Sequence, residues 1–262
     1  MSKASLLAIS AALGVTAGSL GLATPAFAVQ LTLVQDEPYA PAPSGWVDLG
    51  WKVEGRAGAP LGEDYEFAIG PDGAQANKTD DIYRDWNNGE TVDWSFNWDG
   101  QTAKFTLAGE DIFYSLLNPS PNIFNGFSLL TNVDTRTYDA PALGERRVEE
   151  GTAIDLIVET LNGEAVNNIF SNAIGQGEEV QNLSKKFFSS SETINSLAGT
   201  VKVSWLSIDP NEIKARSRVS FQLEGYDFNG EQTSIPEPTS ILSLLAFGAF
   251  GIGSVIKRRQ VN

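Results

Sequence analysis

Strict alternation of apolar and polar residues between positions 91 and 107 constrains this chain more than any other feature. Large apolar residues occupy every second position of residues 92–98 and again of residues 103–107, with Asp99-Gly100 between the two runs. A period of two places all the apolar side chains on one face of a strand, and Asp-Gly between two such runs is a hairpin signal. Residues 92–107 are therefore expected to form a β-hairpin with one buried face.

Shorter runs of the same kind recur along the chain and predict an all-β body. Alternating segments, bounded by Gly, Pro, Asn or Asp, occur at residues 29–34, 46–53, 65–69, 152–161, 200–206 and 218–223. Asn162-Gly163 after the fourth of these is a type I′ turn signal. Residues 164–190 are read differently, because their apolar positions fit helical spacing and predict one short helix. Roughly nine to eleven short strands predict an antiparallel β-sandwich or jelly-roll-like body.

Residues 1–28 have the pattern of a secretory signal peptide. Lys3 supplies the positive start, residues 6–22 are apolar, and Ala26 and Ala28 flank Phe27 as a small-x-small cleavage site. This pattern predicts cleavage by signal peptidase after Ala28, although an uncleaved N-terminal anchor is the alternative. Either way the body is expected to be exported.

Residues 236–262 have the pattern of a membrane tail. The tail opens with Pro236-Glu237-Pro238, continues as an apolar run over residues 241–256 and closes on a basic cluster, Lys257-Arg258-Arg259. Counted from Pro238, the run is about long enough to cross a hydrocarbon core of ~30 Å as a helix, and basic residues favour the cytoplasmic side. A transmembrane helix with the body outside is expected.

These three parts, in this order, resemble the PEP-CTERM sorting signal of bacterial surface proteins. The resemblance implies that an exosortase, a transpeptidase-like membrane enzyme, cuts the tail near Pro236-Glu237-Pro238. The protein would then be released or attached at the cell surface or in the extracellular matrix. An ordinary C-terminal anchor is the alternative. The expected organisation is a signal peptide (1–28), a β-sandwich domain (29–230), a spacer (231–235) and the sorting tail (236–262).

A second resemblance lies in the body. Residues 50–56 read Gly-Trp-Lys-Val-Glu-Gly-Arg and residues 64–70 read Asp-Tyr-Glu-Phe-Ala-Ile-Gly. These two words, together with the tail, resemble a bacterial surface-protein family called choice-of-anchor W. That family brings no catalytic residues that could be assigned to this chain.

Charge and composition narrow the function further. The chain has 18 Lys and Arg and 33 Asp and Glu; the signal peptide holds one basic residue, and the tail holds three basic residues and one acidic residue. The body therefore has 14 basic and 32 acidic residues, a net charge of −18. Such a body repels phosphate backbones, so no nucleic-acid partner is expected. The chain has no Cys and no His, which excludes disulfides, Ser-His-Asp catalysis and the usual zinc sites.

Candidate binding residues lie between positions 72 and 98. Trp94 and Trp98 share a face, which is either the inner face of the sandwich or a platform for sugar rings; the core is the favoured interpretation. Trp86, in a polar turn, is the candidate for an exposed ligand contact. Oxygen ligands in one loop, Asp72, Asp80 and Asp81, make a calcium site a candidate, with a solvated acidic loop as the alternative. No other cofactor is expected.

Two function classes remain open. The first is a non-catalytic cell-surface or matrix protein, with extracellular polysaccharide as a candidate partner of its sandwich. The second is an exported polysaccharide hydrolase that uses paired carboxylates. Because no pair of acidic residues stands in an apolar setting or a recognisable motif, the first class is favoured.

Overall fold

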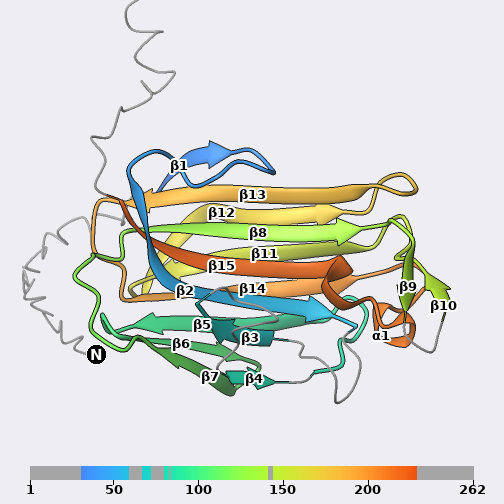
Figure 1. Cartoon of the computed structure of the whole chain (residues 1–262), viewed down its shortest axis with the longest axis horizontal. Helices are drawn as coiled ribbons and strands as arrows, with labels where there is room; N and C mark the ends of the chain where they lie inside the picture. The colour runs from blue at the N-terminus through green and yellow to red at the C-terminus, as the bar shows by residue number, and fades with distance from the viewer. Residues whose placement is uncertain (1–30, 59–66, 72–79, 83, 141–143, 229–262) are drawn as a thin grey trace, which may run out of the picture.

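The computed structural model describes residues 31–58, 67–71, 80–82, 84–140 and 144–228, which form two antiparallel sheets packed face to face (Figure 1). The seven-stranded sheet contains, in spatial order, β1 (Leu31–Asp36), β13 (Gln181–Ser190), β8 (Gly126–Asp134), β15 (Val219–Phe228), β2 (Trp46–Ala57), β3 (Phe67–Gly70) and β4 (Asp80–Ile82). The six-stranded sheet contains β12 (Glu164–Ile174), β11 (Ala153–Leu161), β14 (Ser196–Ser204), β5 (Thr91–Trp98), β6 (Thr102–Leu107) and β7 (Glu110–Ser115). The expected all-β sandwich is confirmed.

Short elements gather at one end of the sandwich, on the right of Figure 1. They are a two-stranded ribbon of β9 (Tyr138–Ala140) and β10 (Gly144–Arg146), helix α1 (Pro210–Ile213) and the 3₁₀ turn η1 (Arg216–Arg218). Asp209 caps α1 by accepting a hydrogen bond from the Asn211 amide at 2.8 Å, and Pro210 occupies the first turn, where its missing N–H costs nothing. The helix ends at Lys214 in a left-handed conformation.

The hairpin predicted at residues 92–107 is present as β5 and β6. Phe96 pairs with Phe105, and both side chains are buried. Asp99 closes the turn, because its Oδ1 accepts hydrogen bonds from the amides of Gln101 and Thr102 at 2.9 and 2.7 Å. Gly100 takes a φ of 93°, a left-handed value that favours glycine.

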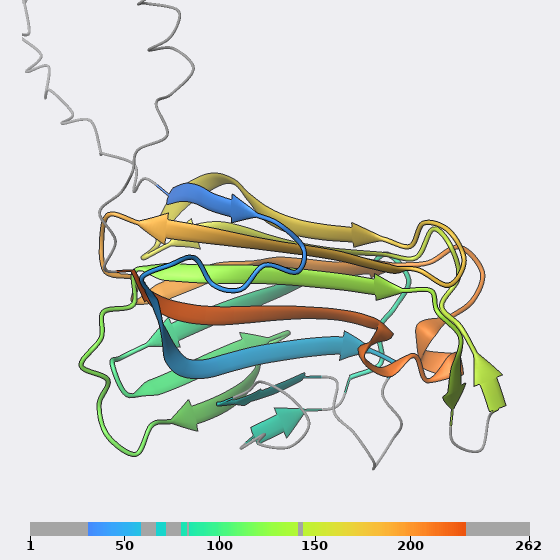
Figure 2. The ribbon, with the colours of Figure 1, turned by 45° about the horizontal axis from the view of Figure 1, so that its top comes forward.

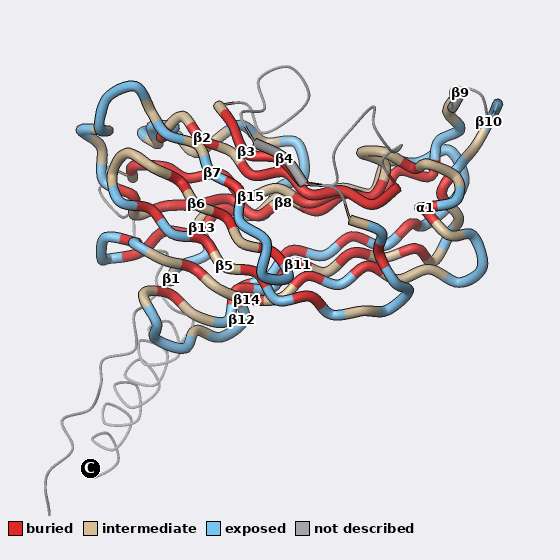
Figure 3. The backbone as a smooth tube through the Cα atoms, turned by 90° about the horizontal axis from the view of Figure 1, so that it is seen from below, coloured by how far each residue is buried: buried red, intermediate tan, exposed pale blue. Residues whose placement is uncertain are grey.

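The core fills the space between the two sheets, where Figure 3 shows the buried segments of both layers facing each other. In β5 the residues at even positions are buried, while those at odd positions are exposed or partly exposed. Figure 2 shows β1 at the edge of the seven-stranded sheet beside β13, with the segment after β1 crossing that sheet to reach β2.

The helix expected within residues 164–190 is wrong, since this segment forms β12 and β13. Two features of β12 hid its strand pattern. One inward position holds Ser171, whose buried hydroxyl is hydrogen-bonded to Thr131 and Ser184 on the opposite sheet. Asn168 takes a φ of 61° where the pairing register with β11 shifts, which displaces the apolar positions. The last strand also continues past the expected end at residue 223 to Phe228.

Candidate functional site

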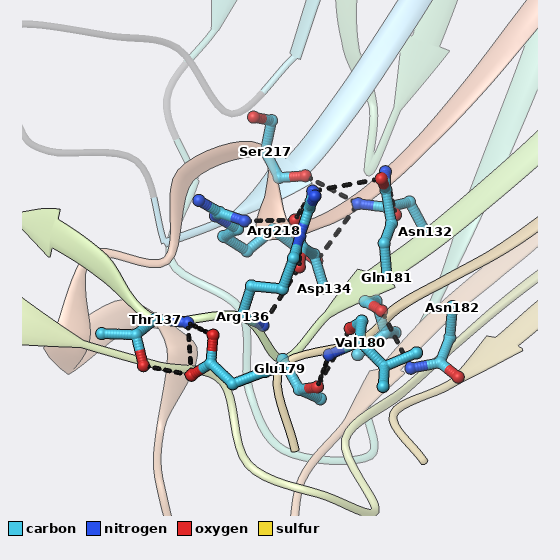
Figure 4. A network of polar contacts seen from close by, with 12 residues as sticks. Asn132, Asp134, Arg136, Thr137, Glu179, Val180, Gln181, Asn182, Ser217 and Arg218 are labelled. Atoms are coloured by element: carbon cyan, nitrogen blue, oxygen red, sulfur yellow. Dashed lines mark hydrogen bonds and ion pairs between the residues drawn. The ribbon is translucent and has the colours of Figure 1, made fainter. Parts of the chain in front are cut away.

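Asp134, the last residue of β8, is the centre of a polar network at the end of the sandwich (Figure 4). The Arg136 guanidinium donates to both of its oxygens, from Nε at 2.8 Å and from Nη2 at 2.7 Å. Arg218, in the 3₁₀ turn η1, donates to Oδ2 from its Nη1. The Asp134 side chain is only 4% exposed, so this carboxylate is a buried charge held by two arginines.

The environment of Asp134 favours its charged form. Burial by itself raises the pKa of the carboxyl, but the hydrogen bonds from Arg136 and the positive charge of Arg218 outweigh burial and leave that pKa lowered. The network therefore ties β8 to the start of β15 while Asp134 is ionised.

The same network fixes Gln181 at the start of β13. Its Oε1 accepts from Arg136 Nη2 at 3.1 Å, and its Nε2 donates to Asn132 Oδ1 at 3.0 Å. Asn132 in turn donates from Nδ2 to the Ser217 carbonyl at 3.0 Å. An amide has two N–H donors and two acceptor lone pairs, so among the described residues Gln181 keeps one N–H and one lone pair for another partner.

Gln181 lines a groove of about 390 Å³ between the end of β12, the start of β13 and the segment after β1. We call it the amide groove, because its polar side chains are Tyr39, Asn172, Gln176, Gln181 and Asn182. Tyr39 is 72% exposed. Neutral amides with a free aromatic ring suit a ligand with many hydroxyl groups, which bond to the amides while a sugar ring lies against the aromatic face.

A second hollow of about 270 Å³ lies near the other side of the β12–β13 connection and contains three carboxylates, Glu149, Glu150 and Glu178. Burial raises the pKa of Glu149, but hydrogen bonds from Ser207 and neighbouring backbone amides outweigh it and leave that pKa lowered. The Glu178 carboxylate accepts from Arg147 at 2.9 Å, which lowers the pKa of Glu178. Glu149 holds the segment at residues 206–207 in place through its hydrogen bonds, while Glu178 forms one ion pair on the surface.

The tryptophans proposed from the sequence are core residues. Trp94 and Trp98 are 3% and 6% exposed, which confirms their favoured interpretation. The prediction that Trp86 is exposed is wrong, because the side chain is 2% exposed. Its indole N–H donates to the Arg56 carbonyl at 3.0 Å, and its carbonyl accepts from Asn211. The polar sequence around Trp86 belongs to a surface turn, but the indole points inward.

Several predicted sites lie outside the described residues. These are the cleavage site at Ala26 and Ala28, the sorting motif Pro236-Glu237-Pro238, the basic cluster Lys257-Arg258-Arg259, and Asp72. Asp80 and Asp81 belong to β4, but their side chains are also outside. Within the described part, no three Asp or Glu side chains are grouped to hold a metal ion. No helix in that same part is long and apolar enough to cross a membrane.

Sequence reasoning missed both the Asp134 network and the amide groove. Asp134 and Arg218 are 84 positions apart, and β8, β13 and η1 meet only in the folded sheet. The spacing Asp134-x-Arg136 is a local signal, but such pairs are common on surfaces. Comparison with protein-family models, with curated proteins and with solved structures found no match for this chain.

Proposed function

We propose that this protein is an exported, non-catalytic cell-surface or extracellular-matrix protein that binds extracellular polysaccharide through the amide groove. The observation that carries the binding role is the combination of an exposed Tyr39 with neutral amides in one hollow, among which Gln181 is held in place by its hydrogen bonds. Groups held in place before binding lose little conformational entropy when the ligand arrives.

The delivery part of the proposal rests on the sequence. Signal peptidase removes residues 1–28, the membrane is spanned by the C-terminal helix, and an exosortase-type enzyme processes Pro236-Glu237-Pro238. The two resemblances, to PEP-CTERM tails and to the choice-of-anchor W family, support the same destination. The protein is tethered by its tail first and reaches the cell surface or the extracellular space afterwards.

The alternative is a secreted polysaccharide hydrolase. A glycosidase needs one carboxylic acid whose pKa is raised, so that it can protonate the leaving group. Among the described residues, every carboxyl group with a shifted pKa has it lowered, including Asp134, Glu149 and Glu178. This favours the binding role over hydrolysis.

A glycan array probed with the full-length protein in detergent micelles, with and without Ca²⁺, tests the proposal. We expect binding to a defined set of glycans and its loss in Tyr39→Ala and Asn172→Ala. The matched controls are Phe113→Ala and Asn97→Ala, an exposed aromatic residue and an exposed amide on the six-stranded sheet. If no glycan binds, or if the controls lose binding equally, the groove is not the site. Release of shorter sugars from a bound glycan would favour the hydrolase.

A further inference from the structure

One face of the β9–β10 ribbon carries Arg146 and lies near two further arginines, Arg216 and Arg218 of η1. Tyr138 pairs with Arg146 across the ribbon, so these two side chains share a face, while Asp139 and Glu145 form the next pair and lie on the opposite face. Arg146 is therefore on the face opposite to the two carboxylates of the ribbon.

The basic face is laid against α1 and η1. The Tyr138 hydroxyl donates to the Ile213 carbonyl at 2.9 Å, and the Arg218 guanidinium lies 5.2 Å from the Tyr138 ring centroid. Burial raises the pKa of the Tyr138 phenol to about 12, while the nearby positive charges of Arg218, Arg216 and Arg146 act in the opposite direction. We call Tyr138, Arg146, Arg216 and Arg218 the arginine cluster.

Within the described part of the chain, the arginine cluster has too few carboxylates to pair with each of its three guanidinium groups. Asp134 accepts from Arg218 but is already shared with Arg136. Neither Arg146 nor Arg216 forms an ion pair with a described residue; Arg146 donates to the Glu145 carbonyl at 2.8 Å. The buried Nε atom of Arg216 has no hydrogen-bond partner among the described residues. Like charges brought together with an unsatisfied donor are costly unless an anion joins them.

Arg216 is held in a backbone conformation that non-glycine residues rarely adopt. Its φ is 55° and that of Lys214 is 57°, left-handed values that are unfavourable for residues other than glycine. The Arg216 amide donates to the Gly58 carbonyl and the Ala215 amide to the Pro210 carbonyl, both at 2.9 Å. Strain of this kind persists where surrounding contacts over-determine it, and it often marks functional positions.

We propose that the arginine cluster binds an oxyanion, a carboxylate or a sulfate group, of an acidic polysaccharide. This rests on the proposed glycan-binding function and names its ligand class. Guanidinium groups are planar forks that match both oxyanions with paired hydrogen bonds. A body of net charge −18 repels a polyanion, so contact requires a local positive site of this kind. Asp134 joins the cluster to the amide groove, since Arg136 contacts Gln181 and Arg218 contacts Tyr138.

The test compares the full-length protein with the double variant Arg146→Gln, Arg216→Gln on three probes: polygalacturonate, dextran sulfate and neutral dextran. The double variant loses at least one charge-assisted contact with the ligand. Its affinity for at least one of the two polyanions is therefore expected to fall by about tenfold or more. The charge-matched control is Lys104→Gln, Lys202→Gln on the six-stranded sheet, which should stay within about twofold of wild type. A preference for polygalacturonate identifies a carboxylate ligand, and a preference for dextran sulfate identifies a sulfate ligand.

Two outcomes overturn the inference: wild type binds neither polyanion, or the double variant and the control lose affinity equally. Thermal unfolding shows whether the double variant still folds. If it does not, the single variant Arg146→Lys is tested in its place. This variant keeps the charge but not the planar guanidinium, so a partial loss of affinity is expected. The proposed groove fails separately, when Tyr39→Ala leaves binding of array glycans unchanged. Equal binding of single-stranded DNA would show general attraction of polyanions and also overturn the inference.

Discussion

Trp51 of β2 stacks on Phe96 of β5 across the interior, with ring centroids 4.2 Å apart and ring planes 28° from parallel. Phe124 packs edge-on against both rings, at 5.4 Å from Trp51 and 5.9 Å from Phe96. Gly225 makes room for the indole, because a Cβ atom at that position would lie 2.1 Å from Trp51. One aromatic cluster thus joins the two sheets.

Trp51→Ala should destabilise the protein by about 3–5 kcal/mol, the usual cost of removing a large aromatic side chain from a core. Trp51 is fully buried, so both its transfer free energy and its contacts are lost. Urea unfolding followed by circular dichroism measures the change. Leu117→Ala is the control, because that side chain is 98% exposed and its removal should be nearly neutral. A similar midpoint for both variants would contradict the assigned role of the stack.

Gly199→Ala should be more damaging than Gly126→Ala. A Cβ atom at Gly199 would lie 1.9 Å from the Ile157 carbonyl oxygen, which is backbone of the neighbouring strand β11 and cannot move alone. At Gly126 the nearest atom is the far edge of the Trp46 indole, at 2.8 Å, and a side chain can shift. We expect a loss of about 1–3 kcal/mol or more at Gly199. The denaturant midpoints of the two variants measure the change in stability. A larger loss of stability in Gly126→Ala than in Gly199→Ala would contradict the prediction.

Asp134→Asn should lower stability at neutral pH by about 1.5–3 kcal/mol, since it removes hydrogen bonds to a buried charged group while the arginines left behind are partly exposed. The folded pKa of Asp134 is lowered relative to the unfolded chain. Its stabilising contribution is therefore complete above the unfolded value of about 4 and is lost as pH falls through the folded pKa. The difference between wild type and variant in urea unfolding should shrink from pH 7 towards pH 2. A difference that does not depend on pH would contradict the ionised network.

Alkaline titration should reveal two late tyrosines. Burial raises the pKa of Tyr138 and that of Tyr226 to about 12, and the Tyr226 hydroxyl also donates to Glu224 at 2.5 Å. The neutral phenols stabilise the fold below pH ~10, and this contribution is lost as pH rises through the folded pKa. Absorbance at 295 nm should show their ionisation near pH 12, and Tyr226→Phe should remove one late step. Complete ionisation of all six tyrosines near pH 10 would contradict their burial.

Replacing Pro236, Glu237 and Pro238 together by Ala should leave membrane insertion intact and abolish processing. Proline lacks a backbone N–H and disfavours helix in the residue before it, so the native motif should stay extended where an enzyme can take it as a strand. The mass of the cell-associated protein, in a host that carries an exosortase, measures the result. If wild type and variant both retain Asn262, the tail is an anchor and not a sorting signal.

The local hairpins were predictable because their signals are short in sequence. Asp99-Gly100 and Asn162-Gly163 each stand between alternating runs, and Asn162 and Gly163 take φ values of 52° and 84°, as a type I′ turn requires. The alternating runs predict strands because a period of two follows from strand geometry alone. By contrast, the interpretation of residues 164–190 failed where a buried Ser171 and a bulge at Asn168 interrupted that period.

By itself, the sequence determined the all-β class and the hairpins and favoured the burial of Trp94 and Trp98, because each depends on neighbours within a few residues. The tertiary structure alone decided that Trp86 points inward, that Asp134 meets Arg218, and that Tyr39 and Gln181 line one groove. In an antiparallel sandwich a strand pairs with partners far away in the chain, and the sheet order β1-β13-β8-β15 is set by packing over the whole core. Sites built at the ends of such strands have no contiguous signal in the sequence.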